Sequence, residues 1–250
     1  LYLNSNSQRV RLADKIGKIN LLRHTYTRTR KKEVQDEFQV IRQPQAEFIT
    51  LDREAPEYDF YNRTSLAIKD YARKADIPRG FLLSMPQRYI SSCMVAAAEY
   101  WKNSYIQTNN LDEIDAYDAL GEDSVNEQLE DRMPLINYLR QEVIPYVDIH
   151  ELEKNDSKYN RLIQVLNKIL EENQKEKVII FSYFRNTLHY LQRKLSDENI
   201  SSQILMGGMQ ENKQFIIDRF RDDSSINILL SSEVASEGVD LQFCRILINY

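Results

Sequence analysis

Glycine and proline are scarce in this chain, which contains 6 of each among its 250 residues. Their scarcity excludes low-complexity and collagen-like sequences and argues against a turn-rich all-β fold. No apolar run is long enough to cross a bilayer, and the first residues lack the apolar stretch of a signal peptide. Because 42% of the residues are hydrophobic, the chain can bury the core of one large domain or two modest ones.

Cysteine and histidine are rare as well. Cys93 and Cys244 lie far apart without a second cysteine at CxxC spacing, so we predict two buried thiols in a cytoplasmic protein. His24, His150 and His189 are scattered along the chain. No cysteine, histidine or carboxylate cluster has the spacing of metal ligands, and the sequence therefore predicts no metal site.

Two nucleotide-binding motifs are also absent. The sequence has no GxxxxGK[ST] stretch, whose backbone would cradle the triphosphate of ATP. Asp112–Asp115 reads DEID, but the residues before it, Asn109–Leu111, are not the buried apolar strand that a magnesium-binding acid pair requires. No Ser/His/Asp or Cys/His arrangement emerges either. We therefore assign no catalytic residue to this chain.

The charge is partitioned along the chain behind a formal net charge of −5. Residues 1–90 sum to +6, residues 91–153 to −11, and residues 154–250 to zero. The basic first part includes a possible phosphate-binding patch at Arg28, Arg30, Lys31 and Lys32. Since solvated helices also carry such residues, charge alone favours solvated helices over a phosphate-binding surface.

Hydrophobic spacing divides the chain into three regions. Residues 1–50 read as a basic segment that is helical over residues 1–40, and a strand is expected at Gln45–Leu51. Residues 51–154 read as a helical region, in which one helix covers Phe81–Asn103. Within that region, residues 104–131 hold nine Asp or Glu and no Lys or Arg, which indicates an exposed acidic insertion.

Residues 155–250 alternate between helix and strand patterns. An Asp-Ser-Lys sequence at residues 156–158 predicts the cap of an amphipathic helix. Apolar runs then predict four strands, at Val178–Phe181, Ser202–Leu205, Ile226–Leu230 and Ile246–Tyr250. The helix expected over Gln210–Arg221 would turn inward its residues Phe215, Ile216 and Phe220. Such alternation is typical of an α/β fold whose parallel sheet carries helices on both faces.

The loops after these strands contain residues suited to ligand binding. In a parallel sheet, ligands bind where the carboxyl ends of the strands open into loops. The residues expected there are Ser182, Arg185, Gly207, Gly208, Ser231, Ser232, Glu233, Glu237, Gly238 and Asp240. Serine hydroxyls and glycine N–H groups contact phosphate oxygens, so this edge predicts a phosphate-bearing ligand. The alternative is that residues 231–242 are only a well-capped connection.

Several segments share their pattern with one known family. They are KVIIFSYFRNTLHYLQRKL from Lys177, LMGGMQENKQFIIDRFR from Leu205, ILLSSEVASEGVDLQFCRILINY from Ile228, and Asp156-Ser157-Lys158. They resemble motif IV with its helix, the next glycine-containing segment, motif V, and the D-S-K that opens the second RecA-like lobe. The family is the Swi/Snf-related helicases and translocases of superfamily two. Upstream, LLRHTYTRTRKKEV and FITLDREAPEYDFY resemble the end of that family's first lobe and the strand and helix after it.

The resemblance implies a RecA-like parallel sheet, the C-terminal lobe of a P-loop NTPase helicase, preceded by a mostly helical region. Residues 1–50 would end the first lobe, residues 51–154 would form a helical linker, and residues 155–250 would form the second lobe. The motif matches imply that three residues lie near the nucleotide: Glu237, Gly238 and Asp240. They also imply contacts to a nucleic-acid backbone from Ser182, Arg185, Gly207, Gly208, Ser231 and Ser232. Lys213 and Glu233 depart from the arginine and aspartate that many members carry.

The function that the resemblance implies is that of a fragment of an ATP-dependent helicase or translocase, with DNA favoured over RNA. ATP and Mg²⁺ would bind only in the complete two-lobe protein, because this chain lacks Walker A, Walker B and motif VI. We therefore expect the isolated chain to be inactive as an ATP hydrolase without its N-terminal helicase lobe. We also expect weak, salt-sensitive binding to nucleic acid and no membrane partner.

Two other functional classes remain as alternatives. A non-catalytic module would dock a protein partner through the acidic segment 104–131 and the helical region. A nucleotide-sugar or dinucleotide enzyme fits less well, because the first strand-to-helix turn of the sheet has no glycine-rich loop. The sequence leaves open whether the protein separates the strands of a nucleic-acid duplex or only translocates along nucleic acid.

Overall fold

The computed structural model describes residues 43–75, 79–103, 129–207, 209, 211–232 and 240–250. The chain divides into two compact units, residues 1–47 and residues 48–250, and the elements named below belong to the second. In these described ranges, no helix is both long and apolar enough to cross a membrane.

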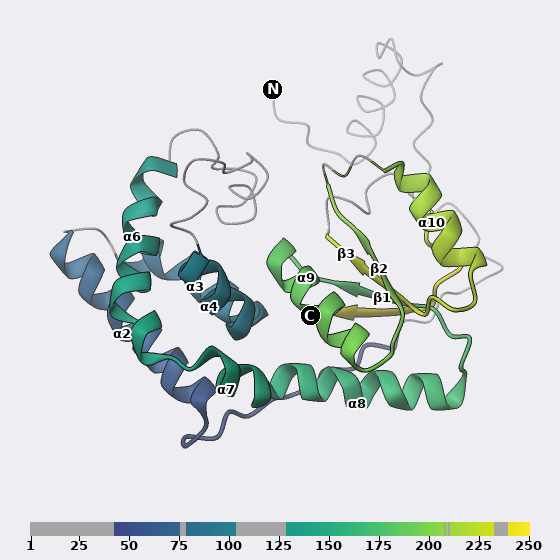
Figure 1. Ribbon diagram of the computed structural model, residues 1–250, viewed down its shortest axis with the longest axis horizontal. Helices are drawn as coiled ribbons and strands as arrows, with labels where there is room; N and C mark the ends of the chain where they lie inside the picture. The colour runs from purple at the N-terminus through teal and green to yellow at the C-terminus, as the bar shows by residue number, and fades with distance from the viewer. Residues whose placement is uncertain (1–42, 76–78, 104–128, 208, 210, 233–239) are drawn as a thin grey trace, which may run out of the picture. The chain divides into compact units, whose positions relative to one another are not determined.

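A four-stranded parallel sheet forms the later part of the unit (Figure 1). Its strands, in spatial order β2-β3-β1-β4, are β1 (Val178–Phe181), β2 (Ser202–Leu205), β3 (Ile228–Ser231) and β4 (Ile246–Asn249). The register of the three strand pairs places at one edge Phe181, Leu205, Ser231 and Asn249. The predicted strands and the α/β fold class are confirmed, although β3 begins two residues later than its apolar run.

Helices cover both faces of this sheet. On one face, α9 (Arg185–Asp197) buries its residues Leu188, Leu191 and Leu195. On the other face, α10 (Lys213–Asp222) buries its residues Ile216, Ile217 and Phe220. Neighbouring strand residues point to opposite faces, so Ile180 of β1 joins the first apolar cluster and Ile179 joins the second.

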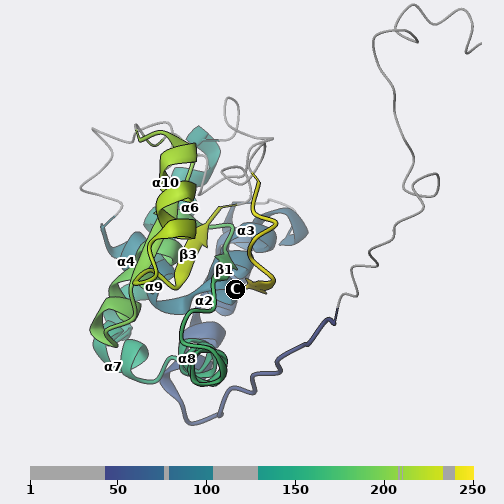
Figure 2. The same ribbon diagram turned by 90° about the vertical axis from the view of Figure 1, so that its right-hand side faces the viewer.

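Helices also make up the part of the unit before β1. They are α2 (Pro56–Lys74), α3 (Arg79–Ser92), α4 (Met94–Asn103), α6 (Leu129–Glu142), the 3₁₀ turn η3 (Ile144–Tyr146), α7 (Ile149–Lys154) and α8 (Ser157–Glu172). α8 runs below the sheet in Figure 1 and is seen end-on in Figure 2. A short connection, residues 173–177, joins the end of α8 to β1.

One apolar cluster runs through both the helical region and the sheet. It contains Phe60 of α2, Trp101 of α4 and Leu139 of α6 together with Leu166 of α8 and Ile180 of β1. The ring centroids of Phe60 and Trp101 lie 5.8 Å apart. Since the cluster continues past the end of α7, the helices and the sheet are stabilised by the same buried surface.

The single helix predicted over residues 81–103 is wrong, because α3 and α4 are separated at Cys93. The Nζ of Lys158 donates hydrogen bonds to the carbonyl oxygens of Ser91, at 2.7 Å, and Ser92, at 2.9 Å. The thiol of Cys93 then accepts the N–H of the residue three positions later, as an N-cap does. A side chain inserted into the backbone hydrogen-bond ladder breaks a helix, and here that side chain comes from α8.

Two further expectations are corrected. Residues 45–51 form no strand, and Phe48 is 91% exposed. The alternation of side chains predicted a strand, but a strand also needs a partner, which alternation does not provide. Phe215 was predicted to face inward but is 58% exposed, whereas Ile217 is fully buried. The two residues lie at opposite borders of the apolar face of α10, where helical spacing does not decide which side is covered.

Several predicted features lie outside the described residues. Of the acidic segment 104–131, only its last three residues are described, and they belong to α6. The helical segment at residues 1–40 is not described, nor is the basic patch within it, Arg28, Arg30, Lys31 and Lys32. These expectations therefore stay predictions.

Candidate functional site at the carboxyl edge of the sheet

The carboxyl ends of β1, β2 and β3 meet at one edge, where the hydrogen-bond ladder continues past the strands. The N–H of Ser182 donates to the carbonyl oxygen of Ser231 at 3.2 Å. The N–H of Ser232 donates to the carbonyl oxygen of Leu205, also at 3.2 Å. Three of the predicted site residues, Ser182, Ser231 and Ser232, are therefore brought together by the parallel register.

The hydroxyl groups of these serines are turned into the protein. The residues Ser182, Ser231 and Ser232 are only 3%, 0% and 8% exposed. The Oγ of Ser231 donates to the carbonyl oxygen of Ser232 at 3.1 Å. Because buried hydroxyls are satisfied by protein groups, the predicted contact of these hydroxyls with phosphate stays a prediction.

Ser92, the last residue of α3, connects this edge to the helical region. Its Oγ lies 3.1 Å from the Oγ of Ser182 and 3.1 Å from the Oγ1 of Thr187. All three hydroxyls are buried, so the protein itself provides their hydrogen-bond partners. Sequence reasoning missed Ser92, because it lies 90 residues before Ser182 and belongs to no recognised motif.

Arg185 joins two of the predicted loops. It is the first residue of α9, and its Nη2 donates to the carbonyl oxygen of Gly207, after β2. This bond brings two more of the predicted site residues together and holds the loops after β1 and β2 against each other. Gly208 lies outside the described residues.

Asp156 caps α8 from a buried position. Its carboxylate accepts the N–H of Tyr159 at 2.8 Å and the O–H of Tyr190, from α9, at 2.7 Å. The predicted cap is therefore confirmed, and the same carboxylate also ties α8 to α9. Burial raises the pKa of Asp156 above its ordinary value, because the low-polarity surroundings disfavour the charged form.

Ser157 and Lys158 turn toward the helical region. The carboxylate of Glu57, in the first turn of α2, accepts hydrogen bonds from both the N–H and the hydroxyl of Ser157, the first at 3.0 Å. The ammonium group of Lys158 binds the end of α3 and lies 4.2 Å from the ring centroid of Tyr250. Burial raises the pKa of Glu57 and lowers the pKa of Lys158. The Asp-Ser-Lys sequence is thus a joint that connects α2, α3 and α9 to α8.

Of the three residues predicted to lie near the nucleotide, the structure describes Asp240. It is exposed, and its Oδ1 accepts the N–H of Gln242 at 3.0 Å, which fixes the turn before β4. Glu233, Glu237 and Gly238 lie outside the described residues. Their assignment to the nucleotide therefore stays a prediction.

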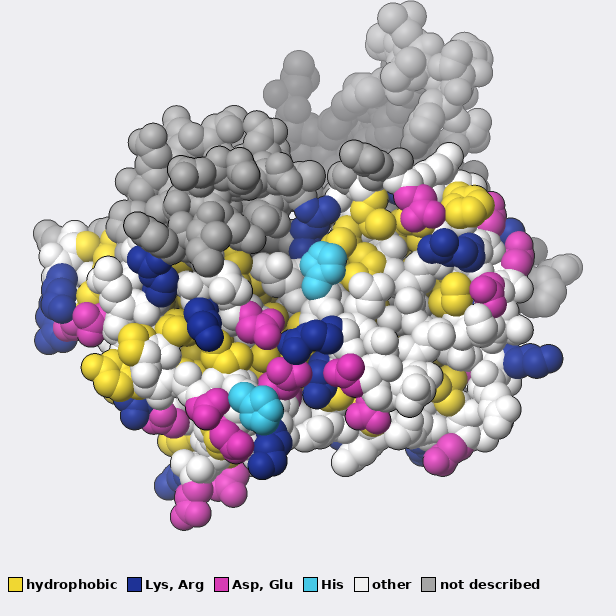
Figure 3. Space-filling model, in the orientation of Figure 1, with side chains coloured by type: hydrophobic (Ala, Val, Ile, Leu, Met, Phe, Trp, Pro, Cys, Tyr) yellow, Lys and Arg dark blue, Asp and Glu magenta, His cyan; other side chains and the backbone are white. Residues whose placement is uncertain are grey.

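The charges on the visible face of the unit are mixed. Figure 3 shows the side chains of Lys and Arg interspersed with those of Asp and Glu over the described residues, without a wide field of one sign. Any binding of a polyanion at the sheet edge therefore depends on individually placed cations rather than on net charge.

Comparison with protein families shows that residues 157–250 match the family described as helicase conserved C-terminal domain. The pre-mRNA-splicing ATP-dependent RNA helicase PRP28 of Meyerozyma guilliermondii is 32% identical over 106 residues, 42% of this chain and 18% of that protein. The uncharacterized ATP-dependent helicase YqhH of Bacillus subtilis is 37% identical over 103 residues, 41% of this chain and 17% of that protein. The chain thus spans less than a fifth of the length of these curated relatives.

Among solved structures, the C-terminal part of the Fun30 ATPase domain has a TM-score of 0.44 and 20% identity, covering 78% of this chain and 71% of that chain. The helicase domain of Pyrococcus furiosus Hef has a TM-score of 0.42 and 18% identity, covering 77% of this chain and 47% of that chain. The family match, which contains all four strands of the parallel sheet, is what assigns the lobe. Residues 157–250 are therefore similar to the helicase conserved C-terminal domain, and the relatives that match are named as ATP-dependent helicases.

Proposed function

We propose that this chain provides the second RecA-like lobe and the helical linker of an ATP-dependent nucleic-acid translocase of the Swi/Snf-related group. The observation that carries the proposal is the edge at which Ser182, Arg185, Gly207, Ser231 and Ser232 converge within a helicase C-terminal domain. Serine, glycine and arginine at the carboxyl edge of a parallel sheet suit the phosphates of a nucleic-acid backbone.

In this proposal the chain has three parts. Residues 1–50 end the first lobe, residues 51–154 form the linker with an acidic insertion, and residues 155–250 form the second lobe. The buried joint around Asp156-Ser157-Lys158 supports the proposal, because it fixes the helices on the lobe that they would help to move.

The nucleotide would lie next to Glu237, Gly238 and Asp240. Of these, the structure describes Asp240, whose exposed carboxylate is available to a ribose hydroxyl or to an arginine of another lobe. The described residues contain no group of three His, Cys, Asp or Glu side chains that could hold a metal ion. The described residues therefore do not form a Mg²⁺ site by themselves.

Binding of the purified chain to fluorescein-labelled single-stranded and duplex DNA and to RNA, followed by fluorescence anisotropy, tests the proposal. We expect binding that weakens as salt rises, because neutralised phosphates release counterions. Tighter binding to DNA than to RNA is the expected order. A flat anisotropy signal for every nucleic acid at low salt would remove the nucleic-acid assignment.

A measurement of ATP hydrolysis by the same sample tests whether this chain hydrolyses ATP without the other lobe. We expect no DNA-stimulated phosphate release from this chain alone, because phosphoryl transfer needs the phosphate loop and arginines of a two-lobe site. Robust stimulated hydrolysis that co-purifies with the chain over two columns would contradict the proposal.

A second candidate function is protein docking by the helical region. The exposed apolar side chains Leu66, 64% exposed, and Tyr146, 66% exposed, favour it, because helical surfaces that bind proteins present such residues. The acidic segment 104–131 would contribute to the same docking function. Loss of partner binding on deleting that segment, with no effect of substitutions at Ser231 and Ser232, would favour docking over translocation.

A further inference from the structure

The last turn of α3 packs against the loop that follows β1. Tyr89 stacks on Phe184 with ring centroids 4.2 Å apart and ring planes 10° apart, and its hydroxyl accepts a hydrogen bond from Asn186 Nδ2 at 2.8 Å. Ser92 meets Ser182 one turn further along α3. The end of α3 is therefore attached to the sheet edge by both apolar and polar contacts.

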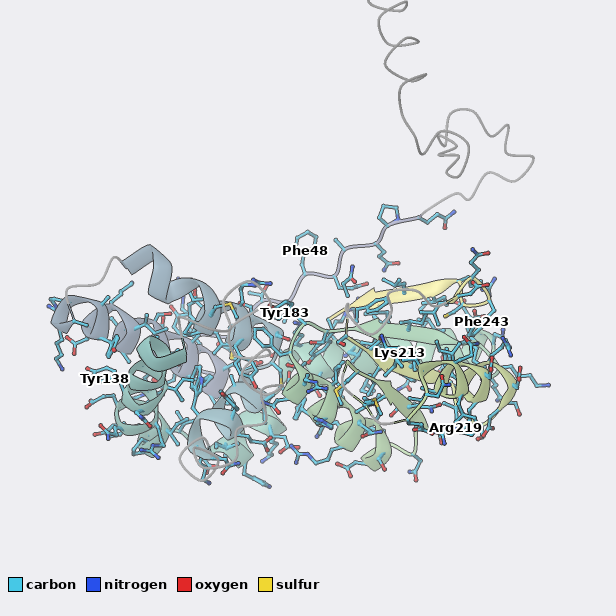
Figure 4. The ribbon with its side chains drawn as sticks, turned by 90° about the horizontal axis from the view of Figure 1, so that it is seen from above. Phe48, Tyr138, Tyr183, Lys213, Arg219 and Phe243 are labelled. Carbon is cyan, nitrogen blue, oxygen red and sulfur yellow. The ribbon has the colours of Figure 1, made fainter. Side chains whose placement is uncertain are left out.

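Arg88 precedes this anchor and lies over the same loop. Its guanidinium carbon is 4.6 Å from the ring centroid of Tyr183, the residue that directly follows Ser182. Tyr183 is half-buried and Arg88 is exposed. Figure 4 shows Tyr183 where the helical region meets the sheet, at the end of the lobe opposite to Phe243. The pair thus brings a cation from the helical region to the carboxyl edge.

The position of Arg88 over the ring of Tyr183 suits a guanidinium that binds an anion. A planar guanidinium that lies flat on an aromatic ring directs its N–H donors outward around its rim, where they match two phosphate oxygens. Among the residues whose side chains the structure describes, no Asp or Glu carboxylate forms an ion pair with Arg88. Its charge is therefore not neutralised within that part of the chain.

Two other cations at this edge already have protein partners. Arg185 donates to the carbonyl oxygen of Gly207, and Lys158 donates to the two carbonyls that end α3. Burial also lowers the pKa of Lys158, since it disfavours the charged ammonium form. Compared with these two side chains, Arg88 is the more exposed to a ligand that approaches from solvent.

We propose that Arg88, held over the ring of Tyr183, binds a phosphodiester group of a nucleic-acid strand at the carboxyl edge of the sheet. The helical region then contributes directly to nucleic-acid binding instead of only connecting two lobes. The proposal rests on the proposed nucleic-acid function and adds to it a residue that lies outside the helicase C-terminal domain, which begins at residue 157. Tyr183 is a positioning residue, because it acts through Arg88.

The test compares Arg88→Gln with the unsubstituted chain in anisotropy titrations against labelled single-stranded DNA at several salt concentrations. Loss of one charge-assisted phosphate contact should weaken binding about three- to tenfold at low salt. It should also reduce the magnitude of the salt slope by about 0.7. Arg88→Lys should restore the slope, because it keeps the charge, but only part of the affinity, because it loses the planar fork.

Two further variants separate the pair from general charge effects. Tyr183→Leu should weaken binding less than Arg88→Gln and leave the salt slope intact, because the charge remains but its position is no longer fixed. Arg73→Gln is the matched control, since Arg73 is a 70% exposed arginine near the end of α2. Its partner Asp70 would still form an ion pair with Lys74. The control should change neither the affinity nor the slope. Circular dichroism melts establish that each variant is folded.

Each outcome has a defined meaning. If the unsubstituted chain does not bind at low salt, the proposed function and this inference both fail. If the chain binds and Arg88→Gln binds equally well with the same slope, the inference alone is overturned. Two competition results would also overturn it. If ATP at matched phosphate concentration displaces the labelled DNA as readily as unlabelled DNA does, the site binds a nucleotide. If polyglutamate does so, the site binds an acidic protein.

Discussion

Asp156 stabilises the protein through one carboxylate that serves two helices. It accepts a backbone N–H at the start of α8 and the hydroxyl of Tyr190 in α9. Loss of an N-cap costs about 1 kcal/mol. A buried hydroxyl left without its partner costs about 1–3 kcal/mol more. We therefore predict that Asp156→Ala lowers the free energy of unfolding by about 2–4 kcal/mol, measured by urea denaturation.

Matched variants separate these two contributions. Asp148 caps α7 with an exposed carboxylate that accepts two backbone N–H groups, so Asp148→Ala should cost only about 1 kcal/mol. Asp156→Asn keeps an acceptor oxygen and should be close to the unsubstituted chain. Equal losses for Asp148→Ala and Asp156→Ala would show that the bond to Tyr190 contributes nothing.

Glu176 gives the stability a pH dependence at the opposite edge of the sheet. Its carboxylate accepts two hydrogen bonds from Arg245, at 2.8 and 2.7 Å, and this pairing lowers the pKa of Glu176 below its ordinary value of 4.5. The native state therefore holds this proton less tightly than the unfolded state does. The contribution of the pair is present above pH 4.5 and is lost as the pH falls through the lowered pKa.

The corresponding prediction is that Glu176→Gln lowers the free energy of unfolding at pH 7 by about 0.5–1 kcal/mol, since the arginine is largely exposed. The difference between variant and unsubstituted chain should shrink on acidification below pH 4.5, followed by urea denaturation across pH. A difference that stays constant or grows toward low pH would contradict the assignment.

At the scale of the elements, α3 depends on contacts that arise only in three dimensions. Ser92 shares hydrogen bonds with Ser182 and Thr187, and Lys158 ends the helix by binding its last carbonyls. We predict that Ser92→Ala lowers stability by about 1–2 kcal/mol, because two buried hydroxyls lose a partner. Hydrogen exchange should increase in α3 and in residues 182–187 more than in β3.

Ser224→Ala provides the control, since Ser224 is exposed in the turn before β3 and should stay within about 0.5 kcal/mol of the unsubstituted chain. Faster exchange across the entire sheet in Ser92→Ala, with no preference for α3, would show that the substitution acts on global stability alone.

The elements themselves were predictable to different degrees. Val178–Phe181 is a short apolar run and Ser202–Leu205 ends in two apolar residues before a glycine-containing loop, and both are strands with the predicted bounds. The break at Cys93 was not predictable, because the lysine that causes it lies far along the chain in α8. The prediction of a strand near Phe48 was wrong for a related reason: the sequence of one segment does not show whether a second segment will pair with it.

The candidate site was also predictable only in part. Ser182, Ser231 and Ser232 were expected together, because the carboxyl ends of parallel strands share an edge, and the register places them there. The burial of their hydroxyls was not expected, since it depends on how the ends of the strands are covered. Arg88 was missed altogether, because single-residue spacing in a helix does not reveal which loop the helix will cover.

At the scale of the whole molecule, the described core begins at Phe60 and continues to Leu230. Residues 1–47 form a separate unit and contribute no residue to that core among those described. We predict that a chain starting at Phe48 unfolds in one transition within about 4 °C of the full chain, as expected when less than 1 kcal/mol is lost. Differential scanning calorimetry is the measurement.

A chain starting at Asn155 is the informative comparison. It loses α2, α4 and α6, whose residues Phe60, Trp101 and Leu139 belong to the same apolar cluster as residues of α8, α9 and the sheet. It should melt at a clearly lower temperature than the chain starting at Phe48. Equal melting temperatures would show that the helical region and the sheet are stabilised independently, against the shared core.

The outer border of β4 has a consequence for handling the protein. β4 pairs with β1 on one side, and in the described ranges no strand pairs with its other side, while Leu247 is 56% exposed. Unpaired backbone amides beside an apolar side chain form a template onto which an extended segment of a second molecule can add. Concentrated solutions should therefore self-associate through this border, and Leu247→Lys should delay the rise in light scattering.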